Sequence, residues 1–162
     1  MMALDTSYQE KQLAGALYAL GVNFVLGGSD EESNLYTQPS DLIAALAKSS
    51  EARLRLSLIP LFLEHPEYAV HVHDTAERLE ASAQLTLQCY YSAAVFLAEK
   101  YSHLGVSLPD HFTEKLNIAL TKDADENLRT LAMRHKELSG THVNWLATYR
   151  HAERVWRRGK VK

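Results

Sequence analysis

The chain has few of the residues that interrupt helices or cross-link loops. Its 162 residues include seven glycines, four prolines and one cysteine, Cys89. A single cysteine excludes an intrachain disulfide, which is the usual state of a cytosolic protein. The sparse glycine and proline leave long periodic segments between them, and the 46% of hydrophobic residues are enough for the core of one domain.

The sequence also lacks a dominant charge and a long apolar run. Its formal net charge is −3, so no field over the whole molecule attracts nucleic acid or a membrane. The stretch LQCYYSAAVFLA has only twelve residues, too few to cross a bilayer. The N-terminus has no basic start followed by an apolar region, so it is not a secretory signal. We therefore expect a cytoplasmic protein without a membrane segment.

Several catalytic and cofactor motifs are absent. There is no Gly-x-Gly-x-x-Gly, no Walker loop, no Gly-x-Ser-x-Gly, no Cys-x-x-Cys and no His-Glu-x-x-His. No two histidines are three or four residues apart, and Glu-x-x-His, which supplies ligands in di-iron helical bundles, does not occur. No cofactor is therefore expected.

The hydrophobic pattern predicts an all-α fold. The strongest periodicity lies at about 75–103, where apolar residues recur three, four or seven positions apart and the middle is apolar on nearly all sides, as in a helix buried in a bundle. Other helices are expected at 7–20, 40–50, 51–64, 109–121, 123–138 and 142–158. The sequence thus predicts one helical domain, 1–162, a bundle of five or six helices around a long, buried central helix.

Two segments do not fit the bundle pattern. Residues 22–39 contain an acidic, polar stretch and are predicted to form a loop or arm, with a short strand at 22–28 as an alternative. Residues 159–162 are predicted to be a frayed basic tail.

The stretch EHPEYAVHVHD, residues 64–74, is rich in possible metal ligands. Pro66 is unfavourable inside a helix, so the preceding helix should stop near Glu64, and Asp74 resembles the N-cap of the central helix. The favoured interpretation is a connector with a short turn at 66–70. The alternative is a metal site that uses His65, His71 and His73, but their spacing provides only two-ligand fragments, whereas zinc needs three or four ligands.

The last helix is amphipathic. Trp145, Tyr149, Ala152 and Trp156 fall within about 60° of one another at 100° per residue, and the arginines gather on the opposite side. One interpretation is a binding surface for an anionic partner, nucleic acid included. The other is a core stripe with a solvated basic face near the helix C-terminus. The candidate binding residues are Trp145, Tyr149, Arg150, Arg154, Trp156, Arg157 and Arg158.

Two further patterns concern catalysis. Cys89 lies in the most apolar stretch, which favours a core thiol over a nucleophile. In RTLAMRH, Arg129 and His135 are separated by five residues. This spacing resembles the Arg-x4–6-His motif of HEPN-domain ribonucleases, which are small helical proteins that often act as dimers. The resemblance implies that Arg129 would stabilise a phosphate and that His135 would assist proton transfer.

Two functions are therefore carried forward. The favoured prediction is a non-catalytic helical interaction or regulatory module that forms a homodimer or binds a protein partner, with no favoured catalytic residue and no favoured metal. The alternative is a nucleic-acid-acting helical protein, at the extreme a HEPN-like ribonuclease of a toxin–antitoxin type system.

Overall fold

A computed structural model describes residues 2–22, 36 and 38–160, with side chains from residue 8 onward. All regular elements in these residues are helical, and they include no strand. The α-helices are α1 (Met2–Ala19), α2 (Pro39–Lys48), α3 (Ala52–Leu56), α4 (Leu58–Glu64), α5 (Val72–Arg78), α6 (Ala81–Lys100), α7 (Ala124–Ser139) and α8 (Trp145–Arg158). Two 3₁₀ helices, η2 (Pro66–His71) and η3 (Ser102–Leu104), flank α5 and α6. The predicted all-α fold is confirmed.

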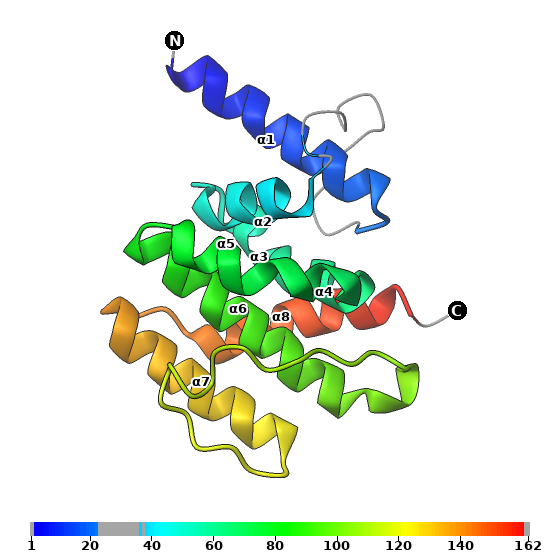
Figure 1. Cartoon of the computed structure of the whole chain (residues 1–162), viewed down its shortest axis with the longest axis vertical. Helices are drawn as coiled ribbons and strands as arrows, with labels where there is room; N and C mark the ends of the chain where they lie inside the picture. The colour runs from blue at the N-terminus through cyan, green and yellow to red at the C-terminus, as the bar shows by residue number, and fades with distance from the viewer. Residues whose placement is uncertain (1, 23–35, 37, 161–162) are drawn as a thin grey trace.

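The helices are stacked in layers around α6 (Figure 1). α1 and α2 lie at one end of the molecule and α7 at the other, with α4, α5, α6 and α8 between them. α6 packs against α2, α4, α5, α7 and α8, and its residues 87–98 are buried without interruption. The prediction of a long, buried central helix is confirmed. No helix in the described residues is long and apolar enough to cross a bilayer.

The central helix begins later than its periodicity predicts. α5 ends at Arg78, Leu79 is extended with ψ 151°, and α6 begins at Ala81. Glu80 is the N-cap of α6, and its carboxylate accepts hydrogen bonds from the backbone N–H of Ser82 and Ala83 at 3.0 and 2.8 Å. The predicted continuous helix over 75–103 is therefore wrong. The apolar period continues through the break because α5 and α6 both pack into the same core.

The prediction that Asp74 is the N-cap of the central helix is wrong. Asp74 lies in the first turn of α5, a short helix that begins at Val72. The other boundaries of this connector agree with the sequence. α4 ends at Glu64, and Pro66 opens η2, the expected short turn.

Residues 51–64 form two short helices. α3 and α4 meet at Ser57, whose hydroxyl donates a hydrogen bond to the carbonyl oxygen of Leu54. Pro60 lies in the first turn of α4, where its missing N–H needs no acceptor. The proline therefore marks a helix restart.

The predicted helix at 109–121 is wrong, because segment 105–123 has no regular structure beyond turns. The Asp110 carboxylate accepts hydrogen bonds from the backbone N–H of Phe112 and Thr113, as an N-cap does, but only a turn follows it. Asn117 has a positive φ of 62°, which an α-helix does not allow.

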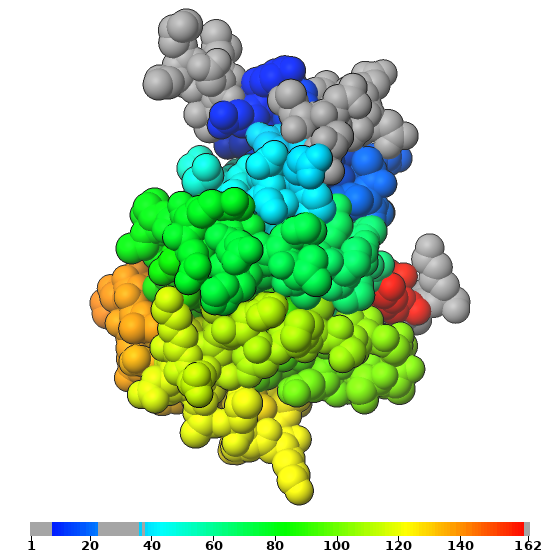
Figure 2. Space-filling view, in the orientation of Figure 1, coloured from blue at the N-terminus to red at the C-terminus, as the bar shows by residue number. Residues whose placement is uncertain are grey.

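Segment 105–123 nevertheless belongs to the core. Leu108, Phe112, Leu116 and Ile118 are buried, and the helix-like spacing of the first three explains the wrong prediction. The Tyr91 hydroxyl of α6 donates a 2.6 Å hydrogen bond to the carbonyl oxygen of Pro109. Figure 2 shows the segment, coloured yellow-green to yellow, covering the lower front of the molecule.

The ends of the remaining helices follow their local sequence. α1 begins at Met2, before the predicted start at Ser7, and it is followed by Gly21 with φ 79°. α7 begins after Asp123, whose carboxylate caps the N–H groups of Asp125 and Glu126. The predictions for 22–39 concern mainly residues 23–35 and 37, which lie outside the described residues, as do 161–162 of the basic tail.

Candidate functional site

The aromatic stripe of α8 faces the interior. Tyr149 and Trp156 are 0% and 4% exposed, and Trp145 is half-buried. The indole N–H of Trp156 donates a 2.7 Å hydrogen bond to Glu64 on α4, and the same carboxylate pairs with Lys160 at 2.6 Å. A partner cannot contact Tyr149 or Trp156 in the folded chain, so these two predicted binding residues belong to the core.

His135 on α7 is packed inside this aromatic cluster. It is 2% exposed, its ring is stacked on Trp145 with 3.6 Å between ring centres, and its Nδ1 lies 2.7 Å from the Tyr149 hydroxyl oxygen. Burial lowers the pKa of His135 to about 3, so the imidazole is neutral at physiological pH. Its ring is a packing group with one buried hydrogen bond.

The structure does not bring Arg129 and His135 together. Six positions along a helix separate their directions by about 120°. Arg129 is exposed, whereas His135 is buried beneath Trp145 and Tyr149. A phosphate bound at Arg129 would therefore lie on a different face of α7 from the His135 ring. This geometry provides no support for the HEPN-like arrangement.

Other side chains that carry nucleophilic chemistry are also buried. Cys89 is 0% exposed, and burial raises the pKa of its thiol to about 12. Burial likewise raises the pKa of the neighbouring Tyr90 to about 12, and raises that of Tyr149 well above its ordinary value. These groups are protonated and inert near neutral pH, as expected for a core cysteine and core tyrosines.

The arginines of α8 divide into internal and exposed side chains. Arg150 forms ion pairs with Asp125 of α7 at 2.8 Å and with Glu153 at 3.1 Å. The Arg157 guanidinium lies over the ring of Tyr101, 4.6 Å from its centre. Both side chains therefore stabilise the contact of α8 with its neighbours.

Glu153 is the centre of this polar network. Its side chain is only 8% exposed, lies 2.7 Å from Lys100 Nζ, and accepts a hydrogen bond from the Tyr101 hydroxyl. Burial raises the pKa of Glu153, but the hydrogen bonds from Lys100, Tyr101 and Arg150 outweigh burial and lower it overall. The hydrogen bonds from Arg150 and Lys100 also lower the pKa of Asp125. The network joins α6, α7 and α8.

Arg154 and Arg158 differ from the other arginines of α8. They are one helical turn apart and both are exposed. Neither forms an ion pair with any described residue, whereas acidic side chains neutralise Arg150 in the second turn of α8 and Lys160 just after its end. We call this pair the α8 basic face. It is the part of the predicted binding surface that a partner can reach.

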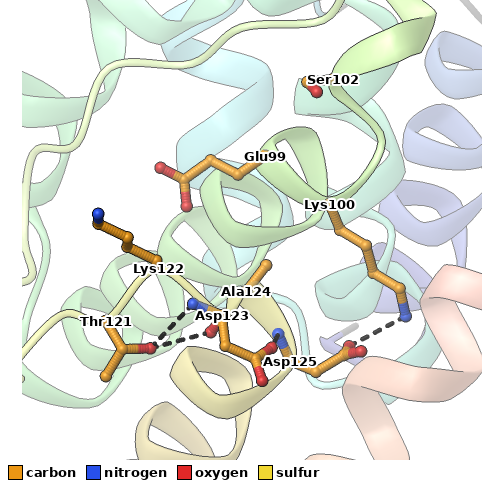
Figure 3. Close-up of a pocket in the computed structure, with 8 residues that line it drawn as sticks. All are labelled: Glu99, Lys100, Ser102, Thr121, Lys122, Asp123, Ala124 and Asp125. Carbon is orange, nitrogen blue, oxygen red and sulfur yellow. Dashed lines mark hydrogen bonds and ion pairs between the residues drawn. The ribbon is translucent and has the colours of Figure 1, made fainter.

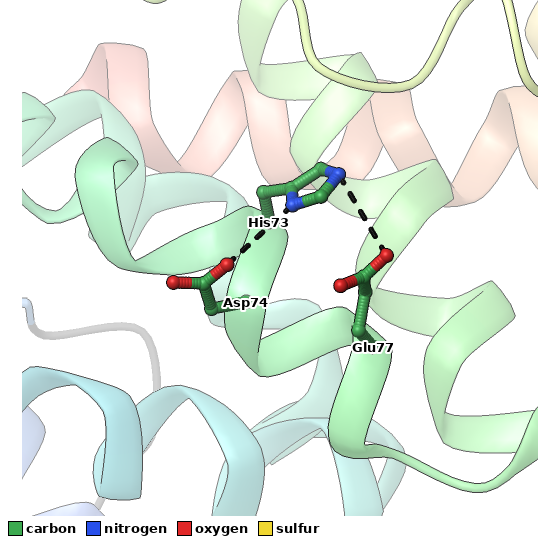
Figure 4. Close-up of side chains that lie close together, drawn as sticks. All are labelled: His73, Asp74 and Glu77. Carbon is green, nitrogen blue, oxygen red and sulfur yellow. Dashed lines mark ion pairs between the residues drawn. The ribbon is translucent and has the colours of Figure 1, made fainter.

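The histidines of the connector do not converge on one point. His65 Nε2 lies 2.6 Å from the carbonyl oxygen of Leu20 at the end of α1, and its Nδ1 lies 3.0 Å from Glu67. His71 is half-buried at the end of η2. His73 is exposed on α5 and lies beside the carboxylates of Asp74 and Glu77 (Figure 4). Of the three predicted ligands, only His73 therefore lies beside two other potential ligands, whereas His65 has one, Glu67.

His73, Asp74 and Glu77 are the one group of three histidine, cysteine or carboxylate side chains in the described residues that are close enough to share an ion. Nδ1 of His73 lies 3.6 Å from Asp74, and Nε2 lies 4.0 Å from Glu77. The two carboxylates thus face different nitrogens of one ring. A single ion cannot be bound by both nitrogens, so it would use Nε2 with Glu77 or Nδ1 with Asp74.

A polar hollow of about 890 Å³ lies where the end of α6 meets the start of α7 (Figure 3). Its lining contains both charges: Glu99 and Lys100 of α6, Lys122 of segment 105–123, and Asp123 and Asp125 at α7. Lys100 and Asp125 are paired at 3.0 Å, and Asp123 caps α7. Glu99 and Lys122 add one charge of each sign, so the hollow shows no selectivity for an anion or a cation.

The chain has no match that would assign a function. No protein-family model matches the sequence, and neither a curated protein nor a solved structure matches it. The sequence prediction missed the Glu153 network. It also missed that His111 lies beside His73 of α5. The i,i+3 spacing of Arg150 and Glu153 is visible in the sequence, but only the fold shows that Asp125 and Lys100 meet them.

Proposed function

We propose that the protein is a non-catalytic binding module that uses the α8 basic face to contact an acidic surface of a protein partner. One observation carries the proposal: Arg154 and Arg158 are exposed and have no carboxylate partner among the described residues, while the neighbouring Arg150 is neutralised within the fold. The buried state of Cys89 and His135 supports a function without catalysis by these groups.

The α8 basic face carries too little positive charge to favour nucleic acid over a protein partner. Proteins that bind nucleic acid tightly neutralise several phosphates, commonly six to ten. The α8 basic face supplies two arginines, and the whole chain carries a net charge of −3. Two arginines are sufficient to select an acidic protein surface and to fix its orientation.

A second copy of the chain is one partner of this kind. The sequence has 20 acidic against 17 basic side chains, so a second copy offers carboxylates. The homodimer predicted from the sequence is compatible with this proposal and stays a prediction. Measuring the mass of the untagged protein under native conditions, over a range of salt and protein concentration, checks it directly.

A charge-reversal pair tests the proposal. In the variant R154E/R158E, both arginines of the α8 basic face are replaced. The matched control is R53E/R129E, which changes two other exposed arginines that form no ion pair with a described residue. Both variants have the same net charge, so any difference between them depends on position.

Partners are identified by quantitative capture on the immobilised chain from an extract of the source organism, and each is then purified and titrated against the three proteins. We expect a partner whose affinity falls at least tenfold for R154E/R158E, falls with added salt, and is unchanged for R53E/R129E. Binding that is lost on nuclease treatment would indicate the nucleic-acid alternative. Equal affinity for both variants would refute the α8 basic face.

A further inference from the structure

His135 of α7 is enclosed by uncharged groups from two other helices. Trp145 and Tyr149 of α8 are stacked on its ring, with 3.6 and 6.1 Å between ring centres, and Tyr90 of α6 contacts it edge to face at 6.0 Å. Burial raises the pKa of both tyrosines and of the nearby thiol of Cys89, so all three groups are neutral near pH 7.

No acidic side chain in the described part of the chain compensates a charge on His135. No carboxylate there pairs with it, and burial is the one cause of its lowered pKa. Its neighbours on the adjacent turns of α7 are Leu131, Ala132, Leu138 and Ser139. Arg55 of α3 acts electrostatically on Tyr90, but its charge is positive and would repel a protonated imidazole. A proton on His135 therefore needs water.

Trp145 is the least firmly held ring of this cluster. It is half-buried, whereas His135 and Tyr149 are 2% and 0% exposed. Its indole N–H is buried and has no hydrogen-bond partner among the described residues. A buried donor without an acceptor is unfavourable, so an outward movement of Trp145 restores a hydrogen bond to water. The same movement opens one face of the His135 ring to solvent.

The turn before Trp145 permits such a movement. Residues 140–144 join α7 to α8 without regular structure beyond a turn, and all five are exposed (Figure 1). Gly140 has φ 69°, a conformation that glycine adopts at low cost. The Asn144 side chain caps α8 by accepting a hydrogen bond from the Ala147 N–H, so cap and first turn can move as one unit.

The second half of α8 is held by contacts that do not change between pH 7 and pH 5. Glu153 pairs with Lys100 at 2.7 Å, and Trp156 donates a 2.7 Å hydrogen bond to Glu64. Burial raises the pKa of Glu153, but its hydrogen bonds lower it overall, so this carboxylate is still ionised at pH 5. Mild acid therefore acts on the first half of α8 and not on the second.

We propose that the contact between His135 and Trp145 is an acid-sensitive switch. Uptake of a proton by the His135 imidazole moves Trp145 and the first turn of α8, residues 145–148, away from α7. The second half of α8 stays in place. The open form hydrates both rings and exposes an aromatic surface beside turn 140–144. The switch is independent of the α8 basic face, because Arg154 and Arg158 lie in the half of α8 that does not move.

The expected size of the effect follows from proton linkage. The pKa of His135 is about 3 in the closed form, against about 6.5 for a histidine in water, so between these values only the open form binds the proton. The closed contact is fully stable above about pH 6.5 and weakens as the pH falls. The open population should rise about 25-fold between pH 7 and pH 5.

The experiment follows hydrogen exchange of the two indole N–H groups in the native chain by NMR, at pH 7 and pH 5, with and without low urea. After correction for the intrinsic effect of pH, we expect the opening constant at Trp145 to rise about 25-fold and to be insensitive to urea, as local opening is. The Trp156 indole, bonded to Glu64, should exchange only through urea-sensitive unfolding of the whole chain.

Two variants assign the effect to one imidazole. His135→Gln should remove the pH dependence at Trp145, whereas His142→Gln, which changes an exposed histidine of turn 140–144, should retain it. Full retention in His135→Gln overturns the switch. So does a result from the native chain alone, which needs no variant to fold: exchange at Trp145 that is as sensitive to urea as at Trp156, or an opening constant that changes less than about threefold.

Discussion

At the residue scale, the polar groups inside the bundle have specific partners that fix how the helices meet. His135 and Tyr149 join α7 to α8, and Glu153 joins α8 to Lys100 of α6. Each of these groups keeps one protonation state in the folded chain, because no solvent is present to stabilise the other state. The stability of the fold should therefore depend on pH through these residues.

His135 should make the fold less stable in mild acid. Its pKa is about 3 in the folded chain, against about 6.5 in the unfolded chain, so the unfolded state binds the additional proton between these values. Stability is thus complete above about pH 6.5 and declines as the pH falls. We expect His135 to account for a loss of roughly 2 kcal/mol between pH 7 and pH 5, measured by urea unfolding.

The control for this pH effect is His142→Gln, which removes an exposed histidine and should keep the full slope. A His135→Gln variant should be less stable at pH 7 but should lose most of the dependence between pH 7 and pH 5. The lowered pKa values of Asp125 and Glu153 act in the same direction, but their effect begins only near their unfolded values, around pH 4 to 4.5. An unaltered slope in His135→Gln would contradict the assignment.

Glu153→Ala should be strongly destabilising. It removes the shared acceptor of Lys100, Tyr101 and Arg150 and leaves two partly buried cations with Asp125 alone. We expect the free energy of unfolding to fall by about 2–3 kcal/mol, measured in urea at pH 7. Glu137→Ala breaks the exposed pair with Arg134 and should change it by less than about 1 kcal/mol. Equal effects would show that the Glu153 network does not stabilise the helix contacts.

At the scale of elements, the sequence predicted helix type well and helix ends less well. The predicted range 123–138 lies within one residue of α7 at each end, where Asp123 precedes the helix and Gly140 follows it with a positive φ. The break at Leu79 was not visible, because Leu79 continues the apolar period and Glu80 is not a common N-cap residue. The cap formed by the long Glu80 side chain is recognised only in the structure, which shows the two backbone N–H groups that it accepts from.

Segment 105–123 shows a different limit of sequence prediction. Its buried residues have the spacing of a helix, but the positive φ of Asn117 ends the turn that Asp110 caps. The segment is kept in place by contacts from α6 and from the connector, which are distant in the chain. The local sequence does not indicate such long-range contacts. The spacing of the apolar residues therefore led to the wrong prediction of a helix at 109–121.

The Tyr91 hydroxyl should be one of the groups that hold this segment. Tyr91→Phe keeps the ring and removes the hydrogen bond to Pro109, so we expect a loss of about 1 kcal/mol in stability. Limited proteolysis should cut within 105–123 faster than in the native chain. Tyr18→Phe, which changes a half-exposed tyrosine on α1, is the control and should leave both measurements unchanged. Equal cleavage rates in all three proteins would contradict this role.

At the scale of the whole molecule, the layers differ in how much of their surface is covered. α6 is in the middle and is enclosed by helices on several sides, whereas α1 lies at the end of the stack and packs mainly on α2 and α3 (Figure 1). Sequence patterns predicted the buried centre but not the order of the layers. The same limit applied to contacts between distant residues, because the rings of His73 and His111 become neighbours only after the chain folds.

α1 should be the first helix to open. Its end is held by His65, whose Nε2 contacts the carbonyl oxygen of Leu20. Losing this contact in His65→Ala should cost about 1 kcal/mol locally and speed amide exchange in the last turn of α1 about fivefold. Amides of α6 should be unaffected. Exchange that rises equally in α1 and α6 would indicate global destabilisation instead, and His142→Ala should show neither effect.

The complete burial of Cys89 has a practical consequence for all of these measurements. A thiol with no exposed surface and a pKa near 12 does not react with alkylating reagents while the chain is folded. A fluorophore or spin label attached to a new cysteine, at Arg158 for example, can therefore be placed without removing the native one. The rate at which Cys89 itself is slowly labelled then measures how often α6 opens.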